Sequence, residues 1–294
     1  DVVLPIRLMK LMGAKVLFLT NASGGIQHGF EAGDFMMITD QIASFVPSPL
    51  IGPNIEEYGE EAVAQYAIAL IIVLIRNMLP AIIDMKSHNI NYEHYEGRTL
   101  SSLKLGIIGC GEVGALVSKI AHFFGMKVMI YSYMQNPELE GFCDFVSFDE
   151  LLKESDIISL HLPYTGDNYH MLGPDEFDKM KDGVYIVNTA RGELLDIKAL
   201  YDNLIKGKVK AAALDVLECE FLSTHPGELT NVIENSNSNC VETALITQKL
   251  FKMDNVIITP HIAYNTNDSV NYLLEKTFNN IRDYLKGLKT NRVC

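Results

Sequence analysis

The sequence predicts an α/β protein built mainly on a doubly wound parallel sheet, with a short α/β N-terminal segment of different character before it. Two observations lead to this prediction. From about residue 98 onward, continuous apolar runs typical of buried parallel strands alternate with helical segments. The first of these runs, Leu103–Gly109, leads directly into a glycine-rich turn that opens a helix.

Each expected element follows from its apolar pattern and from the residues that end it. After residue 98 we expect strands at 103–109, 127–132, 156–163, 183–190, 209–217 and 255–261. Between and after these strands we expect helices at 112–125, 148–155, 174–180, 196–207 and 268–287. Residues 221–245, which include the polar stretch NSNSNC, interrupt the alternation and are expected to form an exposed insertion.

The N-terminal part has its own order of elements. We expect a helix at 5–13, strands at 14–20 and 34–40, and an irregular loop at 47–59. An apolar helix follows, from about Glu60 to Met78. Its most apolar part, Ala67–Ile75, is much shorter than the roughly 20 residues that span a bilayer. We therefore expect a buried helix of a globular protein and no membrane contact.

The composition argues against some classes of partner and site. The 294 residues carry a formal net charge of −13, which disfavours a nucleic-acid or anionic-membrane surface because phosphate binding needs a basic surface. The five cysteines are scattered without a CxxC pair, and no His cluster has metal-ligand spacing. We therefore expect no metal site and a reducing, cytoplasmic location.

The turn after the first strand carries the spacing G-x-G-x-x-G, as Gly109, Gly111 and Gly114. In a dinucleotide-binding (Rossmann) unit the first glycine permits the tight turn and the second lets the backbone approach a pyrophosphate. The third allows close packing of helix on strand. The pyrophosphate would lie at the helix N-terminus, where free N–H groups and the helix dipole favour an anion. The strand-turn-helix context therefore favours a dinucleotide cofactor site over a glycine-rich turn without a ligand.

The position that usually selects between NAD and NADP is unusual. An acidic residue about 20 positions after the glycines normally binds the ribose 2′-OH. Here the next strand ends at Ser132, with no carboxylate and no arginine directly after it. Since no carboxylate would repel a 2′-phosphate, this position leaves the choice between NAD and NADP open. We expect NAD as cofactor, with NADP possible.

Three polar residues stand at or just beyond the ends of later strands, which is the ligand-binding edge of a doubly wound sheet. They are Arg191 in VNTARGELLD, Glu220 in AALDVLECE and His261 in IITPHIAY. Taken singly, an arginine in a loop is usually a solvated charge and a lone histidine a bystander. Together they supply a carboxylate clamp, a proton donor and a group that holds the donor charged.

These features resemble the D-isomer-specific 2-hydroxyacid dehydrogenase family, and most closely its D-lactate dehydrogenase branch, over about residues 61 to 287. The resemblance is carried, in order, by AVAQYAIALIIVLIRN, IIGCGEVG, SDIISLHLPYTGDNYHML, MKDGVYIVNTARGELLD, AALDVLECE and NVIITPHIAYNT. It implies that Arg191 binds substrate, that His261 is the acid/base and that Glu220 is the partner of His261. It also implies cofactor contacts from Glu112, Val113, Ser132, Leu162, Pro163, Asn168, Thr189, Ala190 and Asp215, together with the three glycines.

The mechanism implied by the resemblance is reduction of a small 2-keto acid such as pyruvate. Arg191 would hold the carboxylate by a two-pronged contact, and the nicotinamide would deliver hydride to the carbonyl carbon. Protonated His261 would give a proton to the oxygen, and Glu220 would raise the pKa of that histidine. In this family a helix such as the one expected at 60–78 packs across a two-fold interface, so we expect a homodimer.

Residues 1–60 do not resemble the substrate-covering domain of that family. PIRLMKLMGAKVLFLTNASGGIQHGFEAGDFMMITDQI and PLIGPNIEEYG resemble a fragment of the purine nucleoside phosphorylases, in which the loop corresponding to Asn21 and Ala22 helps to hold phosphate. The other phosphate ligands and the purine-binding carboxylate of that family have no counterpart here. Two families therefore meet near residue 60, by natural fusion, recombination or an assembly artefact.

The sequence divides into four parts with different expected roles. These are a phosphorylase-like segment at 1–60, a linking and dimerisation helix region at 61–97, a dinucleotide-binding domain at 98–268 and a C-terminal helix at 269–294. The leading hypothesis is a nicotinamide-dependent 2-hydroxyacid dehydrogenase. A non-catalytic NAD(P)-binding protein that has lost its substrate domain is the alternative, and a phosphorolytic fragment is a minor one.

Overall fold

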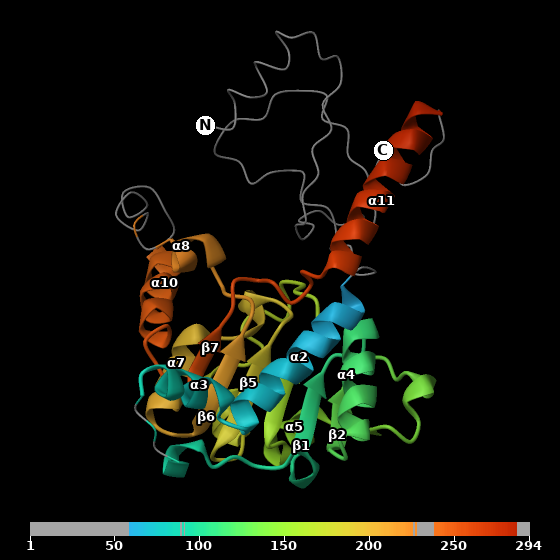
Figure 1. Cartoon of the computed structure of the whole chain (residues 1–294). Coiled ribbons are helices and arrows are strands. Elements are labelled where there is room, and N and C mark those ends of the chain that lie inside the picture. The colour runs from blue at the N-terminus through green and yellow to red at the C-terminus, as the bar shows by residue number, and fades with distance from the viewer. Residues whose placement is uncertain (1–58, 89, 91, 226, 228–237, 287–294) are drawn as a thin grey trace. The chain divides into compact units, whose positions relative to one another are not determined.

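The structure is a computed structural model of the chain, and it describes residues 59–88, 90, 92–225, 227 and 238–286 (Figure 1). The chain separates into two compact units, one formed by Gly59–Thr266 and the other by Asp1–Tyr58 with Asn267–Cys294. The elements expected at 5–13, 14–20 and 34–40, and nearly all of the loop at 47–59, lie outside the described residues. In the second unit the described element is helix α11 (Asn267–Leu285), which confirms the expected C-terminal helix.

The unit Gly59–Thr266 is built on a parallel sheet of seven strands in the order β3-β2-β1-β4-β5-β6-β7. This confirms the predicted doubly wound sheet, since every pairing is parallel and the order reverses at β1. The strands are β1 (Lys104–Ile108), β2 (Lys127–Tyr131), β3 (Asp144–Phe145), β4 (Ile157–Leu160), β5 (Val184–Asn188), β6 (Val209–Leu214) and β7 (Val256–Ile258). The two-residue strand β3 has too short an apolar run to be expected from sequence.

Helices cover both faces of the sheet, which explains the nearly continuous burial of its strands. The helices are α2 (Glu60–Ile75), α3 (Met78–Lys86), α4 (Glu112–Phe123), α5 (Phe148–Glu154), α6 (Pro174–Lys179), α7 (Ile197–Ile205), α8 (Glu220–Thr224) and α10 (Ser238–Leu250). Helices α2 and α4 lie together on one face (Figure 1), and their buried side chains pack with those of β1 and β2. On the other face, α5, α6, α7 and α10 pack in a second apolar cluster.

Short 3-10 turns connect several of these elements. They are η2 (Tyr92–Tyr95), η3 (Leu100–Ser102), η4 (Pro137–Leu139) and η5 (Gly192–Leu194). The last of them follows the loop after β5, where Arg191 is the residue directly before its first turn.

The apolar helix expected from Glu60 to Met78 is interrupted. Helix α2 ends at Ile75, and Asn77, with a φ of 49°, turns the chain into α3 at an angle of 67°. Burial on most sides of α2 is confirmed, because seven of its residues are buried, including Ile71 and Ile75 at 1% exposure. Among the described helices none is singly long and apolar enough to cross a membrane, although α2 and α3 together meet the criteria of length and composition.

The expectation of an exposed insertion at 221–245 is partly wrong. Residues 238–245 belong to α10, whose Ala244 and Leu250 are fully buried. Helix α8 lies beside α10 (Figure 1), and the side chain of Gln248 donates a hydrogen bond of 2.6 Å to the backbone oxygen of Ser223. The polar stretch masks this helix in the sequence, because the apolar residues that pack come only after it.

Candidate functional site

The glycine-rich turn after β1 lies where the strand order reverses, at the carboxyl ends of the strands. Gly109 has a φ of +105°, and a Cβ there would lie 2.5 Å from the carbonyl oxygen of His161. A Cβ on Gly114 would collide with the carbonyl oxygen of Gly109, so helix α4 can pack this closely only with glycine. A Cβ on Gly111 would meet no atom within 4 Å. The side of the turn that the sequence assigns to a pyrophosphate is therefore open.

The loop after β5 contains a polar atom that needs a partner. The hydroxyl of Thr189 is buried, and among the described residues it has no hydrogen-bond partner. A buried hydroxyl without a partner costs free energy, and a polar ligand in this loop would remove that cost. Together with the open Gly111 and the free N–H groups at the start of α4, this atom fits a dinucleotide cofactor.

His261 and Glu220 face each other after β7 and at the start of α8. The Nδ1 of His261 lies 3.2 and 3.1 Å from the two carboxylate oxygens of Glu220. The structure thus brings together two of the three residues that the sequence singled out at the strand ends. Both side chains are partly exposed, so the imidazole can reach a small molecule at this edge.

The charge state of His261 is set mainly by that contact. The hydrogen bond to Glu220 raises the pKa of His261 above its ordinary value, and burial opposes this shift. The charge of Asp215 also raises the pKa, whereas the charge of Arg191 lowers it. His161 shows the opposite case, since full burial lowers its pKa to about 4 while its Nε2 lies 2.8 Å from the hydroxyl of Ser159. Of these two histidines, His261 is therefore the one whose surroundings favour the protonated ring.

Asp215 orients the loop that carries His261. Its buried carboxylate accepts hydrogen bonds from the Thr259 hydroxyl at 2.5 Å and from the backbone N–H groups of Ile262 and Ala263 at 3.0 and 2.8 Å. These three contacts bracket His261, whose φ of 54° is unusual for a residue other than glycine. The backbone at His261 is thus held by its neighbours.

Arg191 lies in the loop after β5, and the side chain of Asn188 holds this loop by hydrogen bonds. The buried Asn188 donates to the carbonyl oxygen of Arg191 at 2.8 Å and accepts from the N–H of Ala190 at 3.0 Å. The guanidinium of Arg191 donates to the carbonyl oxygen of Ala190 at 2.6 Å. A Cβ on Gly192 would collide with the backbone of Leu217 and Glu218. That glycine therefore lets the Arg191 loop approach the loop that leads to Glu220.

The remaining sequence-assigned positions border the same edge. Asn168 closes the loop after β4, because its amide donates to the carbonyl oxygen of Pro163 at 2.8 Å and accepts from the N–H of Thr165 at 2.9 Å. Leu162 is half-buried against the core, and Glu112 and Val113 begin α4. Ser132 follows β2, and its hydroxyl accepts from the N–H of Met134 at 3.3 Å.

A cluster around the buried Glu218 that sequence reasoning missed ties two of these loops together. The carboxylate of Glu218 accepts a hydrogen bond of 2.7 Å from the hydroxyl of Tyr169 and lies 3.0 Å from the Nε2 of His170. The rings of Tyr169 and His170 are stacked with centroids 3.8 Å apart. Burial, with the negative Glu218 beside it, strongly raises the pKa of Tyr169, so this hydroxyl stays protonated. The residues lie about 50 positions apart, and no local pattern marks such a pairing.

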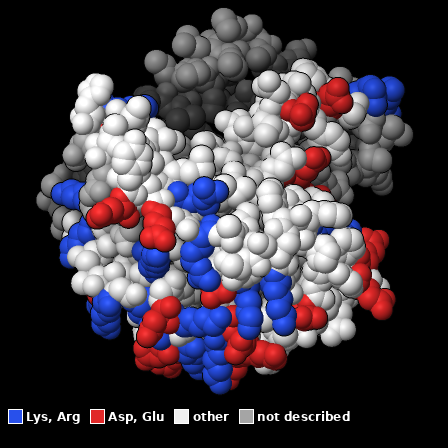
Figure 2. Space-filling view, turned by 60° about the horizontal axis from the view of Figure 1, so that its bottom comes forward, with Lys and Arg blue, Asp and Glu red and all other residues white. Residues whose placement is uncertain are grey.

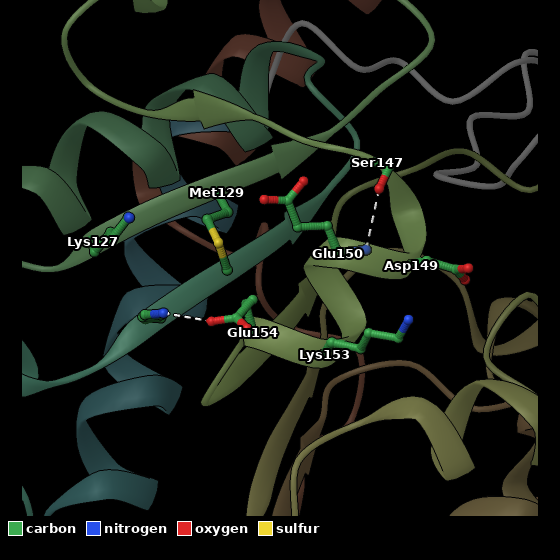
Figure 3. A pocket seen from close by; sticks show the side chains of 8 residues that line it. Lys127, Met129, Ser147, Asp149, Glu150, Lys153 and Glu154 are labelled. Atoms are coloured by element: carbon green, nitrogen blue, oxygen red, sulfur yellow. Dashed lines mark hydrogen bonds and ion pairs between the residues drawn. The ribbon is translucent and has the colours of Figure 1, made fainter.

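A surface hollow lies at the opposite edge of the sheet. It has a volume of about 370 Å³ and is lined by the first residues of β1 and β2, Lys104 and Lys127, and by α5. The carboxylate of Glu154 lies 2.6 Å from the Nζ of Lys104. Figure 3 shows Ser147, whose hydroxyl caps α5 by accepting a hydrogen bond from the N–H of Glu150. Acidic and basic side chains alternate over this side of the molecule (Figure 2). Since the glycine turn and His261 belong to the carboxyl ends of the strands, the hollow takes no part in the candidate site.

Comparison with known proteins identifies the family. The profile of the D-isomer specific 2-hydroxyacid dehydrogenase NAD binding domain matches residues 68–263. The profile of the phosphorylase superfamily matches residues 1–104, in agreement with the resemblance of the N-terminal segment.

Individual relatives agree with the family match. An aromatic 2-oxoacid reductase of Clostridium sporogenes is 36% identical over 244 residues, covering 82% of this chain and 71% of that protein. A D-lactate dehydrogenase of Lactiplantibacillus plantarum is 33% identical over 79% of this chain and 68% of its own length.

The fold is shared with solved structures. The D-lactate dehydrogenase of Aquifex aeolicus, solved with NAD and lactic acid, superposes with a TM-score of 0.72 at 38% identity, covering 80% of this chain and 69% of that one. The apo D-lactate dehydrogenase of Escherichia coli gives 0.68 at 30% identity, covering 80% and 68%. By its family profile, its relatives and its fold, this chain belongs to the D-isomer specific 2-hydroxyacid dehydrogenases.

Proposed function

We propose that this protein is an NAD-dependent dehydrogenase that reduces a small 2-keto acid to the corresponding D-2-hydroxy acid. The observation that carries the proposal is the His261–Glu220 pair, with Nδ1–oxygen distances of 3.2 and 3.1 Å. The pair lies at the same sheet edge as the glycine turn. A histidine whose pKa is raised by a carboxylate is suited to donate a proton to a keto oxygen.

The roles of the chain's own residues follow from their chemistry. Arg191 binds the substrate carboxylate through two parallel N–H donors. His261 donates its proton to the keto oxygen, and Glu220 stabilises the imidazolium before the transfer. Asp215 holds the backbone on both sides of His261 through Thr259, Ile262 and Ala263.

The residues that would hold NAD lie in the glycine turn, at the start of α4 and in the segments that follow β2, β4, β5 and β6. They comprise Gly109, Gly111, Glu112, Val113, Gly114, Ser132, Leu162, Pro163, Asn168, Thr189, Ala190 and Asp215. When bound, NADH supplies the hydride, and the protein supplies position and charge. Ser132 places no carboxylate beside the ribose, so we propose that NADP is also accepted, with NAD as the ordinary cofactor.

The proposal is tested by following NADH absorbance with pyruvate, 2-ketobutyrate and phenylpyruvate as substrates. We expect turnover on at least one of them, and a loss of at least about 100-fold in His261→Gln with nearly unchanged NADH affinity. Tight NADH binding without turnover on any 2-keto acid would support the non-catalytic NAD(P)-binding alternative instead. Phosphorolysis is the minor alternative, and inosine with inorganic phosphate tests it directly.

We also propose that the protein is a homodimer. Helix α3 and the turn after it expose large apolar side chains, among them Ile83 at 55%, Met85 at 63% and Tyr92 at 81%. A second copy related by a two-fold axis would cover such a surface. Light scattering at micromolar concentration decides this, and a monodisperse monomer would refute it.

We propose a cytoplasmic location as well. The family's soluble small-acid substrates support it, and cell fractionation tests it.

A further inference from the structure

Cys219 and Cys240 form a disulfide in the structure, although the sequence shows no paired spacing for them. Their Cα atoms lie 5.6 Å apart, and the two residues are separated by 21 positions. The bond joins the residue directly before α8 to the first turn of α10. It is thus a covalent tie between the loop after β6 and a helix that packs on α7 and α8.

Cys219 lies between Glu218 and Glu220 in the sequence, and these two carboxylates have different partners. Glu218 is buried and engaged with Tyr169 and His170, whereas Glu220 reaches out to His261. The side chain of Glu220 is 38% exposed, so burial contributes little to its direction. Cys219 directly precedes Glu220, so its backbone conformation sets where the Glu220 side chain leaves the main chain.

That conformation is one that cysteine rarely adopts. Cys219 has a φ of 50° and a ψ of 43°, in the left-handed region. Residues other than glycine remain there only when their surroundings hold them. The disulfide to α10 is one such constraint, and the contact of Gln248 with the Ser223 backbone is another. Opening the disulfide removes the constraint that acts directly on Cys219.

The two sulfurs are placed for thiol–disulfide exchange. Both cysteines are half-buried, so a small thiol can approach them. Cys240 lies in the first turn of a 13-residue helix, where the dipole favours a thiolate. Cys110 and Cys143 differ, because burial raises the pKa of both thiols, that of Cys143 to about 11. Those two are weak nucleophiles by comparison.

We propose that Cys219 and Cys240 are a reversible dithiol–disulfide site that controls the position of Glu220 relative to His261. A cellular dithiol reduces the bond by exchange: two electrons and two protons pass to the cysteines, and the reductant becomes a disulfide. A low-molecular-weight disulfide reverses the exchange and is itself reduced to two thiols. Transient disulfides of this kind occur in reducing compartments as redox sensors.

We expect reduction of the disulfide to lower the pKa of His261. The charged or titratable groups that act on this imidazole are Glu220 from α8, Asp215 from the loop after β6 and Arg191 from the loop after β5. The ring of Tyr264 lies edge-on with its centroid 6.3 Å away. Of these, Glu220 is the group attached next to the disulfide. Its displacement lowers the pKa of His261 while Asp215 and Arg191 stay in place.

The experiment compares the full chain oxidised with glutathione disulfide and the same protein reduced with dithiothreitol. Alkylation followed by mass spectrometry counts the free thiols in each state. NMR titration of the His261 ring, assigned with His261→Gln, measures its pKa without any need for turnover. We expect a lower pKa in the reduced protein and a kcat/KM at pH 8 that falls by about fivefold or more.

Two variants and a matched control separate the site from a general effect of reduction. Cys219→Ser and Cys240→Ser should each behave like the reduced enzyme and no longer respond to either reagent. Cys143→Ser should keep the full response. Identical His261 pKa values in the two redox states would overturn the proposal, as would two alkylatable thiols at 219 and 240 after oxidation. The inference rests on the proposed function, but the thiol count and the NMR titration remain decisive if no keto acid is turned over.

Discussion

At the scale of single residues, the contacts of each histidine decide how readily its ring takes up a proton. Glu220 raises the pKa of His261, whereas burial lowers the pKa of His161 to about 4. Two histidines of one chain are thus driven in opposite directions by their surroundings. The difference makes the acid/base assignment testable through pH.

Replacing Glu220 with Gln should move the pH dependence of keto-acid reduction. The pKa of His261 is raised in the folded protein, so its proton is present at low pH and is lost as the pH rises through that value. Without the carboxylate the loss begins at lower pH. Profiles of kcat/KM should therefore nearly coincide at low pH and diverge as the pH rises above about 6.5, with the Gln variant the less active by about severalfold. Parallel profiles at every pH would exclude Glu220 from this role.

Arg191→Lys should raise KM for the keto acid and also lower kcat. An ammonium is a point charge that does not reproduce the two parallel donors of a guanidinium, and the clamp also aligns the carbonyl. NADH affinity should change little. Arg76→Lys, at the exposed end of α2, is the matched control and should leave both constants unchanged. If Arg191→Lys also leaves the kinetics unchanged, the arginine only pairs with a surface group.

Thr189→Val should weaken NADH binding without lowering the stability of the cofactor-free protein. The buried Thr189 hydroxyl has no partner among the described residues, so its loss should leave the stability of the cofactor-free protein unchanged or slightly higher. NADH affinity should fall about 2- to 10-fold, which corresponds to one hydrogen bond. Thr247→Val is the control, since that hydroxyl donates to the Thr243 carbonyl oxygen at 2.9 Å. It should cost about 1 kcal/mol of stability and spare NADH binding.

At the scale of secondary-structure elements, α2 illustrates how burial stabilises the sheet. It is apolar on nearly every side because it packs against α4 and the strands β5 and β6. Ile71→Ala should cost about 2–5 kcal/mol in the free energy of unfolding, because a buried side chain leaves a cavity. Ile83→Ala on α3 is the matched control, since that side chain is 55% exposed. Chemical denaturation of both variants gives the comparison, and equal costs would contradict the packing assigned to α2.

The strands and most helices could be predicted from sequence because their signals are local. Continuous apolar runs mark β1, β4, β5 and β6, and the glycine spacing marks the turn before α4. The break at Asn77 was missed because the apolar run continues across it, although asparagine tolerates the left-handed conformation and Pro80 follows three residues later. The roles of Asn188 and Glu218 also escaped prediction. They act between loops that the fold brings together, as in the contact between Tyr169 and Glu218, 49 positions apart. The same holds for the pairing of Cys219 with Cys240.

At the scale of the whole molecule, the site belongs to one unit. Every residue assigned to cofactor or acid/base chemistry lies within Gly59–Thr266. NADH should therefore stabilise this unit by mass action, by about 2.7 kcal/mol at 100 times its dissociation constant. Thermal unfolding followed with and without NADH measures the shift. A melting temperature that does not rise with NADH concentration would show that the unit binds no cofactor.

The position of α2 also bears on how such a chain could arise by gene rearrangement. The helix precedes the first strand in sequence, yet its seven buried residues line the same core as α4. A recombination breakpoint upstream of Gly59 leaves that lining in place, so a foreign exon could be joined there while the downstream unit retains its fold. A breakpoint between α2 and β1 would remove α2 and expose the apolar side chains that it covers. A folded product therefore favours a junction before α2 over one between α2 and β1.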